Sequence, residues 1–377
     1  MGRAWLAAVG AEAGAELAGV VDLDVDAARR ALADAGLPGV PVGTDAVDLA
    51  RATGARAVVD VTVPAAHHPV TTAALFAGLP VLGEKPAAAT VAETLSLVAA
   101  AEVTGQLFMV SQSRRYNPQL AAFRRQAGTL GRPGLLTTEF FRAPRFGGFR
   151  EEMAHPLLVD MAIHPFDTAR YLLDAEPVSV YCESFNPPWS WYSGDAAASA
   201  VFEMTGGVRY AYTGSWCSPW RETSWNGAWR LSGEHGTASW DGDHDPEVER
   251  APAPAGEEAR GGAAGGESTG EGIAGALTAF LAALDGGPVP RGEVHENVLS
   301  LAMVEAAVAS ATSGERVLVD DVLERAHAEA LATEAREDVR ARLASWTSVR
   351  AALGTERGTE LGTELGTELG AARGARP

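Results

Sequence analysis

The chain has 377 residues, of which 46% are hydrophobic and 21% are charged, and its formal net charge at pH 7 is -19. This length suffices for two domains with separate cores, and the composition is typical of a soluble globular protein. The acidic balance argues against nucleic acid or an anionic membrane as a partner, because both require a basic surface. We therefore expect a small-molecule substrate, and we expect neither nucleic acid nor membrane as a partner.

Cysteine content and targeting signals indicate the cellular compartment. Cys182 and Cys217 are the only cysteines, too few for a disulfide framework or a thiolate zinc site. The start shows no basic segment followed by a long apolar stretch, and no apolar run is long enough to cross a bilayer. The sequence therefore predicts a cytoplasmic protein.

From residue 16 to residue 113, short apolar runs alternate with helical stretches, a pattern that indicates βαβ units and a parallel sheet. Thr90 and Glu93 have capping-box spacing for a helix that begins after Pro86, although two polar residues on a solvated turn would look the same. The first helix is expected through residues 4–11. The expected strands are residues 16–22, 57–63, 79–84 and 107–113.

From about residue 135 to residue 242, strands follow one another, which predicts an α+β domain with an antiparallel sheet. Gly206-Gly207 between two of these strands indicates a hairpin turn. The expected strands are residues 135–142, 179–185, 197–204, 208–216, 229–233 and 237–241.

Two segments are too polar or too glycine-rich to form a core. Residues 243–272 contain mostly Gly, Pro, Ala and Glu, and we expect a flexible loop there. Helices are expected at residues 273–284 and 297–312. From Gly354 the tail repeats Gly-Thr-Glu-Leu, and glycine in every repeat disfavours helix, so we expect disorder and assign the tail no chemistry.

Lys85 stands directly after an apolar run, at the carboxyl edge of an expected buried strand, where open α/β sheets bind ligands. An ammonium group there can hydrogen-bond a reacting oxygen and stabilise developing charge. A lone lysine after a strand is more often simply exposed, but its setting between Glu84 and Pro86 favours a functional role.

Asp160 and His164 are further candidate catalytic residues. His164 titrates near neutrality and can accept a proton, and Asp160 would share its face in a continuous helix. Pro165 predicts a kink or a new helix start at this point. Asp167 either orients the imidazole or caps the following helix. With His155 these side chains offer metal-ligand types, but no metal is expected because lysine and histidine suffice for the proton chemistry.

These motifs, in this order and separation, resemble the glucose-fructose oxidoreductase and inositol 2-dehydrogenase family (Gfo/Idh/MocA) over roughly residues 2–330. The resemblance implies an NAD(P)-dependent dehydrogenase that transfers hydride between nicotinamide and a CH–OH group of a sugar, inositol or related polyol. It also implies a homo-oligomer formed through the sheet domain. The implied parts are a Rossmann-like dinucleotide-binding domain with a parallel sheet at 1–118, an α+β substrate and oligomerisation domain with a large, mainly antiparallel sheet at 119–335, and an extension at 336–377.

The resemblance also assigns roles to residues. Lys85 becomes the catalytic lysine, His164 the base, and Asp160 its substrate-orienting, proton-relaying partner. For His67 a structural role with satisfied hydrogen bonds is an equal alternative, and Tyr116 either lines the substrate cleft or packs. The implied cofactor contacts are Gly2, Asp22, Thr62, Pro64, His67, Glu84 and Lys85, and the implied substrate contacts are Lys85, Tyr116, Asp160 and His164.

The start departs from the family pattern of a strand followed by G-x-G-x-x-G, in which glycines let the backbone approach the pyrophosphate. Gly2 matches the third glycine, and Asp22 falls where an acid binds the ribose hydroxyls, which favours NAD over NADP. Alternatively, Asp22 is a solvated turn residue. Either the start is assigned too far downstream or dinucleotide binding has been lost. The other site residues favour the first explanation, which predicts that upstream codons encode the strand and the Gly-x-Gly loop.

Six tryptophans of the sheet domain suit the apolar faces of sugar rings, although strands also use aromatic residues in cores and interfaces. Two further functions stay open: an NAD-using glycosidase on the same scaffold and a non-catalytic ligand sensor. Intact Lys85 and His164 argue against the sensor, whereas the incomplete glycine loop argues for it. The tryptophans are Trp189, Trp191, Trp216, Trp220, Trp225 and Trp229.

Overall fold

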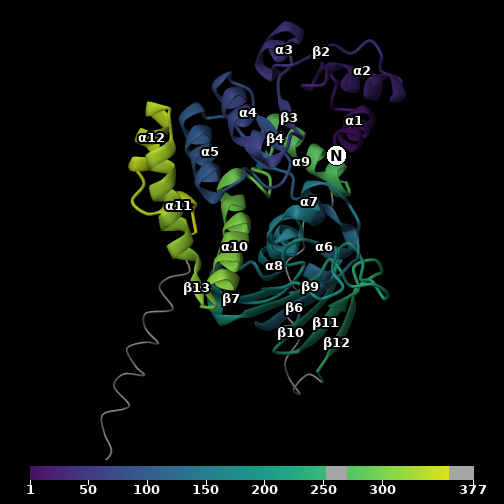
Figure 1. Ribbon diagram of the computed structural model, residues 1–377, viewed down its shortest axis with the longest axis vertical. Helices are drawn as coiled ribbons and strands as arrows, with labels where there is room; N and C mark the ends of the chain where they lie inside the picture. Colours follow the sequence, from purple (N-terminus) through teal and green to yellow (C-terminus); the bar gives the residue numbers. More distant parts are fainter. Residues whose placement is uncertain (252–269, 356–377) are drawn as a thin grey trace, which may run out of the picture. The chain divides into compact units, whose positions relative to one another are not determined.

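The computed structural model describes residues 1–251 and 270–355, which form two compact units (Figure 1). Each unit combines stretches that are far apart in the sequence, whereas the sequence analysis divided the chain into continuous ranges. Most of the expected loop at 243–272 and most of the repeat tail lie outside the described residues. Among the described residues, unit 1 contains Met1–Ala121, 270–301 and Arg325–Ser345, and unit 2 contains 122–251, Ala302–Glu324 and 346–355.

Unit 1 contains five short parallel strands in two sheets. Strand β1 (Val20–Val21) pairs with β2 (Val42–Gly43), and β3 (Val58–Asp60), β4 (Val81–Gly83) and β5 (Phe108–Val110) form a second sheet in that order. Within the described residues, β1 and β3 each pair on one side only.

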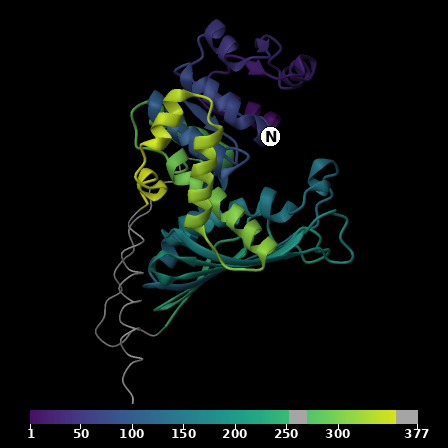
Figure 2. The ribbon, with the colours of Figure 1, turned by 60° about the vertical axis from the view of Figure 1, so that its left-hand side comes forward.

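Helix α5 is the helix that the sequence predicted after Pro86, and most of its residues are buried. Thr90 Oγ1 accepts from the Glu93 amide at 3.1 Å and Glu93 Oε2 accepts from the Ala89 amide at 3.0 Å, which confirms the capping box. Its apolar residues are buried nearly all round because α4 and α12 both pack against it (Figure 2). The helices that lie wholly within unit 1 are α1 (Gly2–Ala11), α2 (Val25–Asp34), α3 (Ala46–Thr53), α4 (Pro64–Phe76), α5 (Val91–Thr104), η1 (Ser113–Tyr116), α9 (Gly272–Leu284) and α12 (Glu337–Ala344).

Helix α9 returns to unit 1 from far along the chain and packs on α1. Trp5 and Val9 of α1 share a hydrophobic cluster with Leu277 and Phe280 of α9. Burial of these side chains holds the two helices together. The sequence predicted α9 as a helix but gave no indication that it joins the first unit.

Unit 2 is built on a mixed eight-stranded sheet in the order β12-β11-β10-β6-β9-β8-β7-β13 (Figure 1). All neighbours are antiparallel except β6 and β9, so the prediction of a mainly antiparallel sheet is confirmed. Gly206 and Gly207 have positive φ in the turn from β8 to β9, as a hairpin requires. The strands are β6 (Pro133–Phe141), β7 (Pro177–Phe185), β8 (Ala197–Met204), β9 (Arg209–Ser215), β10 (Ala228–Gly233), β11 (Gly236–Trp240), β12 (Glu247–Arg250) and β13 (Val317–Leu318).

Strand β12 lies inside the segment that we expected to be a flexible loop. Its Glu and Arg side chains contribute no core, but its backbone pairs with β11 at the edge of the sheet. Backbone hydrogen bonding to an existing edge needs no apolar side chains, which explains why composition did not reveal the strand.

One face of this sheet packs on helix α8 (Ile163–Leu173). Phe166 of α8 makes edge-to-face contacts with Phe202 and Tyr212, at centroid distances of 4.8 and 5.4 Å. Along each strand, the residues between those that face α8 point to the opposite face of the sheet and are more exposed. Tyr181 and Val201 are two examples. The remaining helices are α6 (Pro118–Ala127), α7 (Phe149–Glu152), η2 (Leu157–Met161), η3 (Thr205–Gly207), α10 (Val294–Ser313), α11 (Val319–Thr333) and α13 (Val349–Ala352). None of the helices among the described residues combines the length and apolarity needed to cross a bilayer.

Candidate active site

Lys85 follows β4 at the carboxyl edge of the three-stranded sheet of unit 1. The strand forms because Val81 and Leu82 are fully buried between β3 and β5, and the Glu84 amide extends the ladder by donating to the Asp60 carbonyl oxygen at 2.8 Å. Lys85 itself is half-buried. It is also the only lysine in the chain, since every other one of the 30 lysine and arginine side chains is arginine. A compact ammonium group therefore stands at a ligand-binding edge.

Glu84 directs its carboxylate into unit 1. Trp5 Nε1 donates to Oε1 at 2.7 Å, and the Lys85 amide donates to Oε2 at 3.2 Å. The sequence analysis expected a cofactor contact from Glu84. In the structure, both oxygens of this carboxylate accept hydrogen bonds from the protein, one from Trp5 of α1 and one from the Lys85 amide.

Thr62, Pro64 and His67 form the turn from β3 into α4. Thr62 donates to Asp60 Oδ1 through its amide at 3.1 Å and its hydroxyl at 2.7 Å, while Pro64 begins α4. His67 is 2% exposed, with Nδ1 2.7 Å from the Pro86 carbonyl oxygen and Nε2 3.0 Å from the Thr62 carbonyl oxygen. Both ring nitrogens therefore contact the backbone, which favours the structural interpretation of His67. Thr62 and Pro64 are exposed at the edge where a ligand would bind.

Helix α1 and Asp22 supply features that fit a dinucleotide. Gly2 begins α1, no described side chain caps that end, and a Cβ at Gly2 would meet no atom within 4 Å. An uncapped helix N-terminus suits phosphate oxygens. Asp22 follows β1 and is exposed; its Oδ1 accepts from the Asp24 amide at 2.8 Å, and its Oδ2 makes no hydrogen bond within the described residues. The α1 N-terminus and the exposed Asp22 carboxylate are chemically compatible with the phosphates and ribose hydroxyls of NAD.

Tyr116 lies in η1 of unit 1 and packs rather than standing open. Its ring contacts the hydrophobic cluster of α1 and α9, and a Cβ at Gly275 of α9 would lie 2.7 Å from the Tyr116 Cβ. This close approach of α9 supports the packing interpretation. The neighbouring Arg115 is buried and makes an ion pair with Glu296 at 2.7 Å.

Asp160 and His164 lie on either side of a junction between two helical segments of unit 2. Asp160 belongs to the π-helical segment η2, and His164 to the first turn of α8. Both side chains are half-buried. Pro165 falls in the first turn of α8, where a missing amide is tolerated, so the predicted helix start is confirmed. A π-helical turn of this kind is frequent at functional sites.

Arg150 holds Asp160, a contact that the sequence analysis missed. Its Nε donates to Asp160 Oδ2 at 2.7 Å, and its guanidinium lies 4.8 Å from the centroid of the Phe149 ring. Gly147 and Gly148, which precede α7, both have a φ of 65°. A charge-assisted bond of this length fixes one orientation of the carboxylate. In the sequence, a Gly-Gly turn precedes Arg150, but this pattern does not indicate which carboxylate the arginine contacts.

Asp167 is 2% exposed on the buried face of α8. Because Ala162 is the N-cap of that helix, the capping alternative for Asp167 is wrong. His155 Nδ1 lies 3.2 Å from Ser184 Oγ. In the part of the chain that the structure describes, no group of three or more His, Cys, Asp and Glu side chains has an arrangement that could hold a metal ion.

The tryptophans divide between core and surface. Trp216 and Trp229 are buried in unit 2, and Trp229 stacks on Tyr210 at a centroid distance of 6.3 Å. Core packing explains these two. Trp189, Trp220 and Trp225 are exposed.

The structure therefore groups the predicted residues by unit. Unit 1 brings together Thr62, Pro64, His67, Glu84 and Lys85 at one sheet edge, and it carries Gly2 and Asp22 on α1 and after β1. Unit 2 carries Asp160 and His164 at the η2–α8 junction. A parallel-sheet unit with an uncapped helix N-terminus, and a second unit in which an acid and a histidine lie at a helix junction beside a large mixed sheet, are consistent with an oxidoreductase built on a dinucleotide-binding domain.

Comparison with known proteins names the family. Residues 1–112 match the oxidoreductase family with an NAD-binding Rossmann fold (GFO_IDH_MocA), and residues 120–239 match the GFO/IDH/MocA C-terminal domain. Together these matches span more than half of the chain. The protein belongs to the Gfo/Idh/MocA family of oxidoreductases, and it carries that family's NAD-binding Rossmann domain.

Three relatives show how far the likeness extends. An uncharacterized protein, y4oX of Sinorhizobium fredii, is 29% identical over 320 residues, covering 82% of this chain and 89% of that protein. Inositol 2-dehydrogenase 4 of Saccharopolyspora erythraea is 37% identical over 170 residues, which is 44% of this chain and only 49% of that enzyme. An oxidoreductase from Agrobacterium radiobacter, solved with NAD+, L-tartaric acid and magnesium, shares the fold with a TM-score of 0.74 at 19% identity, covering 85% and 96% of the chains.

Proposed function

We propose that the protein is an NAD-dependent dehydrogenase that acts on a CH–OH group of a sugar, inositol or related polyol. The observation that carries the proposal is the position of Lys85. Lys85 is the only lysine among the 30 lysine and arginine residues of the chain. It follows β4 at the sheet edge where ligands bind. The likeness to an inositol 2-dehydrogenase, which extends over 170 residues of the chain, supports the polyol class.

Each residue has a separate role in this reaction. Bound NAD supplies the hydride acceptor. The Lys85 ammonium donates a hydrogen bond to the reacting hydroxyl oxygen, which orients it and stabilises its charge. His164 accepts the hydroxyl proton while the carbon loses hydride, so the alcohol becomes a carbonyl. Asp160, held by Arg150 at 2.7 Å, orients the substrate hydroxyl and relays the proton.

We also propose that the sheet face opposite α8 mediates self-association. Leu135, Tyr181 and Val201 are exposed on this face. Apolar groups on an open sheet face are stabilised when a second copy covers them. Light scattering should then give the mass of an oligomer, and Tyr181→Glu with Val201→Glu should give that of the monomer.

The cysteines bear on the cellular compartment that we propose. Cys182 and Cys217 are both buried and form no disulfide, which agrees with a reducing cytoplasm.

The decisive experiment is an assay of the purified chain with NAD+ and myo-inositol, followed by a panel of free sugars and polyols, with NADH formation as the readout. The proposal expects NADH in amounts equal to the oxidised product. Cleavage of a glycoside without net NADH would identify the glycosidase alternative. Polyol binding by calorimetry without turnover would identify the sensor.

A further inference from the structure

The Glu84 carboxylate connects two elements of unit 1 that are far apart in the sequence. Glu84 is 9% exposed and lies just after β4, and a buried carboxylate requires hydrogen-bond donors. Trp5 Nε1 donates to one oxygen at 2.7 Å, and the Lys85 amide donates to the other at 3.2 Å. One carboxylate thus ties an indole of α1 to the peptide group of Lys85.

The Trp5 indole cannot easily turn away from this bond. It is 3% exposed and shares a packed cluster with Leu82 of β4 and Met109 of β5. Tight packing restricts a side chain to one rotamer. The indole N–H can only donate, so Glu84 is held by a donor whose position the core determines.

A second contact holds the other side of the lysine. The Pro86 carbonyl oxygen lies 2.7 Å from His67 Nδ1, and His67 also contacts the Thr62 carbonyl oxygen. The backbone before Lys85 is therefore held by the Glu84 carboxylate, which Trp5 of α1 fixes, and the backbone after it is held by the buried His67 of α4. Such support by surrounding residues is what keeps a reactive group within the narrow geometry that catalysis needs.

We propose that Trp5 is a positioning residue for Lys85 and acts through the Glu84 carboxylate. This inference rests on the proposed function, because it assumes that Lys85 contacts the reacting oxygen. Trp5 lies on the same helix as Gly2, so the helix whose N-terminus suits the cofactor phosphates also carries the side chain that fixes the lysine. Loss of the indole N–H should therefore lower kcat more than it raises KM.

The kinetic test compares Trp5→Phe with Trp240→Phe, using NAD+ and myo-inositol. Trp240 is a matched control, since it is also 3% exposed and donates its indole N–H at 2.8 Å, but to the His244 carbonyl oxygen in unit 2. Trp5→Phe should reduce kcat at least about tenfold with KM for both substrates changed less than about threefold. Trp240→Phe should leave kcat within about twofold of the wild-type value.

A double-mutant cycle separates positioning from general damage. If Trp5 acts through Lys85, Trp5→Phe should have no further effect on the residual kcat of Lys85→Ala. An equal fall in both backgrounds would overturn the inference while leaving the proposed function in place. Wild-type activity in Lys85→Ala would instead overturn the catalytic role of Lys85, and the inference with it.

A second readout does not depend on turnover. Because the chain has a single lysine, [15N]lysine labelling gives one backbone amide signal, that of Lys85. The amide donates to Glu84 Oε2, so its hydrogen exchange should accelerate at least about tenfold in Trp5→Phe and stay unchanged in Trp240→Phe. Unchanged exchange in a folded Trp5→Phe protein would contradict the inference. If that variant does not fold, Glu84→Gln, which keeps the shape of the side chain, should show the same acceleration.

Discussion

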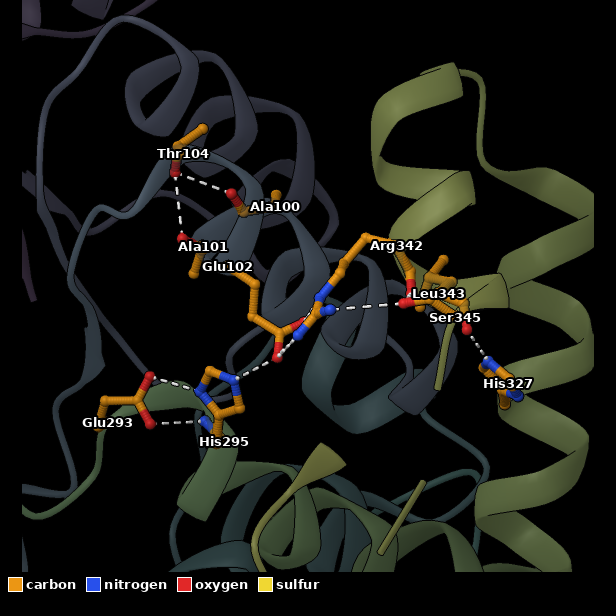
Figure 3. Close-up of polar contacts among 10 residues, drawn as sticks. All are labelled: Ala100, Ala101, Glu102, Thr104, Glu293, His295, His327, Arg342, Leu343 and Ser345. Carbon is orange, nitrogen blue, oxygen red and sulfur yellow. Dashed lines mark hydrogen bonds and ion pairs between the residues drawn. The ribbon is translucent and has the colours of Figure 1, made fainter. Parts of the chain in front are cut away.

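Arg342 of α12 makes a two-pronged ion pair with Glu102 of α5, with Nε 2.8 Å from Oε2 and Nη2 3.1 Å from Oε1 (Figure 3). The same Glu102 carboxylate lies 3.3 Å from His295 Nε2, and His295 Nδ1 lies 2.8 Å from Glu293 Oε1 (Figure 3). These four side chains join α12, α5 and the start of α10 within unit 1. They act beside the apolar contact between α12 and α5, so the final helix of unit 1 is held by both packing and charge.

Replacing Arg342 by alanine should weaken the attachment of α12. The Arg342 side chain is 46% exposed, so solvent screens the pair, and we expect a loss of about 1 kcal/mol in the free energy of unfolding. Denaturant unfolding of the full chain measures this loss. Arg340→Ala, on the same helix but without an ion pair among the described residues, is the matched control. Equal losses in the two variants would show that the pair adds no stability.

Stability should depend on pH through His295. Burial lowers the pKa of this histidine, but hydrogen bonds and charge attraction from Glu293 and Glu102 outweigh burial, so its pKa lies above the ordinary value of 6.5. A raised pKa in the folded state means that the contribution is complete below pH 6.5. It is lost as pH rises through the folded pKa.

The free energy of unfolding of wild type and His295→Asn, measured from pH 6 to pH 9, tests this dependence. The advantage of the wild type should shrink as pH rises. His244 is a suitable control, because Asp241 also raises its pKa but the pair is on the surface. His244→Asn should change the pH profile less than His295→Asn, and a pH-independent advantage of His295 would contradict the assignment.

Lys85→Ala and His164→Ala should each lower kcat by about 10² to 10⁴, because general acid-base groups typically contribute rate factors of this size. NAD affinity, measured by calorimetry, should change only a few-fold, because the other expected cofactor contacts remain intact in both variants. Lys85→Arg serves as the matched variant. It keeps the positive charge but not the compact ammonium, so it should recover little activity. Turnover within a few-fold of wild type in either alanine variant would remove that residue from its role.

Arg150→Ala should lower kcat with myo-inositol, because it releases the Asp160 carboxylate from its single orientation. Arg150→Lys can restore charge but not the Nε contact, and we expect only partial recovery. Steady-state kinetics at saturating NAD+ measures both variants. Full activity in Arg150→Ala would show that Asp160 needs no such support.

Asp22 should decide between NAD and NADP. Asp22→Ser removes a carboxylate that would repel the 2′-phosphate, so the ratio of NADP to NAD affinity should rise at least about tenfold. Asp26→Ser, in the first turn of α2, removes an exposed carboxylate that pairs with Arg29, and it should leave the ratio unchanged. Calorimetric titration with each dinucleotide measures the ratio.

Patterns that act over a few residues were readable from the sequence. Apolar runs bounded by turn residues predicted β3, β4 and β5 and six strands of unit 2, because strand and turn formation depends on near neighbours. The Thr90–Glu93 capping box and the break at Pro165 are likewise local effects of one side chain on nearby backbone. Lys85 was identifiable because its position after a strand already implied the ligand-binding edge.

Contacts between distant segments were decided by the tertiary structure alone. Trp5 and Glu84 are 79 residues apart, and Glu102 and Arg342 are 240 apart. Nothing in the local sequence of an indole or a guanidinium specifies which carboxylate it will meet, since that depends on the path of the whole chain. For the same reason the return of α9 and α12 to unit 1 escaped prediction: an amphipathic helix shows that it will pack, but the partner surface exists only after the rest of the chain has folded.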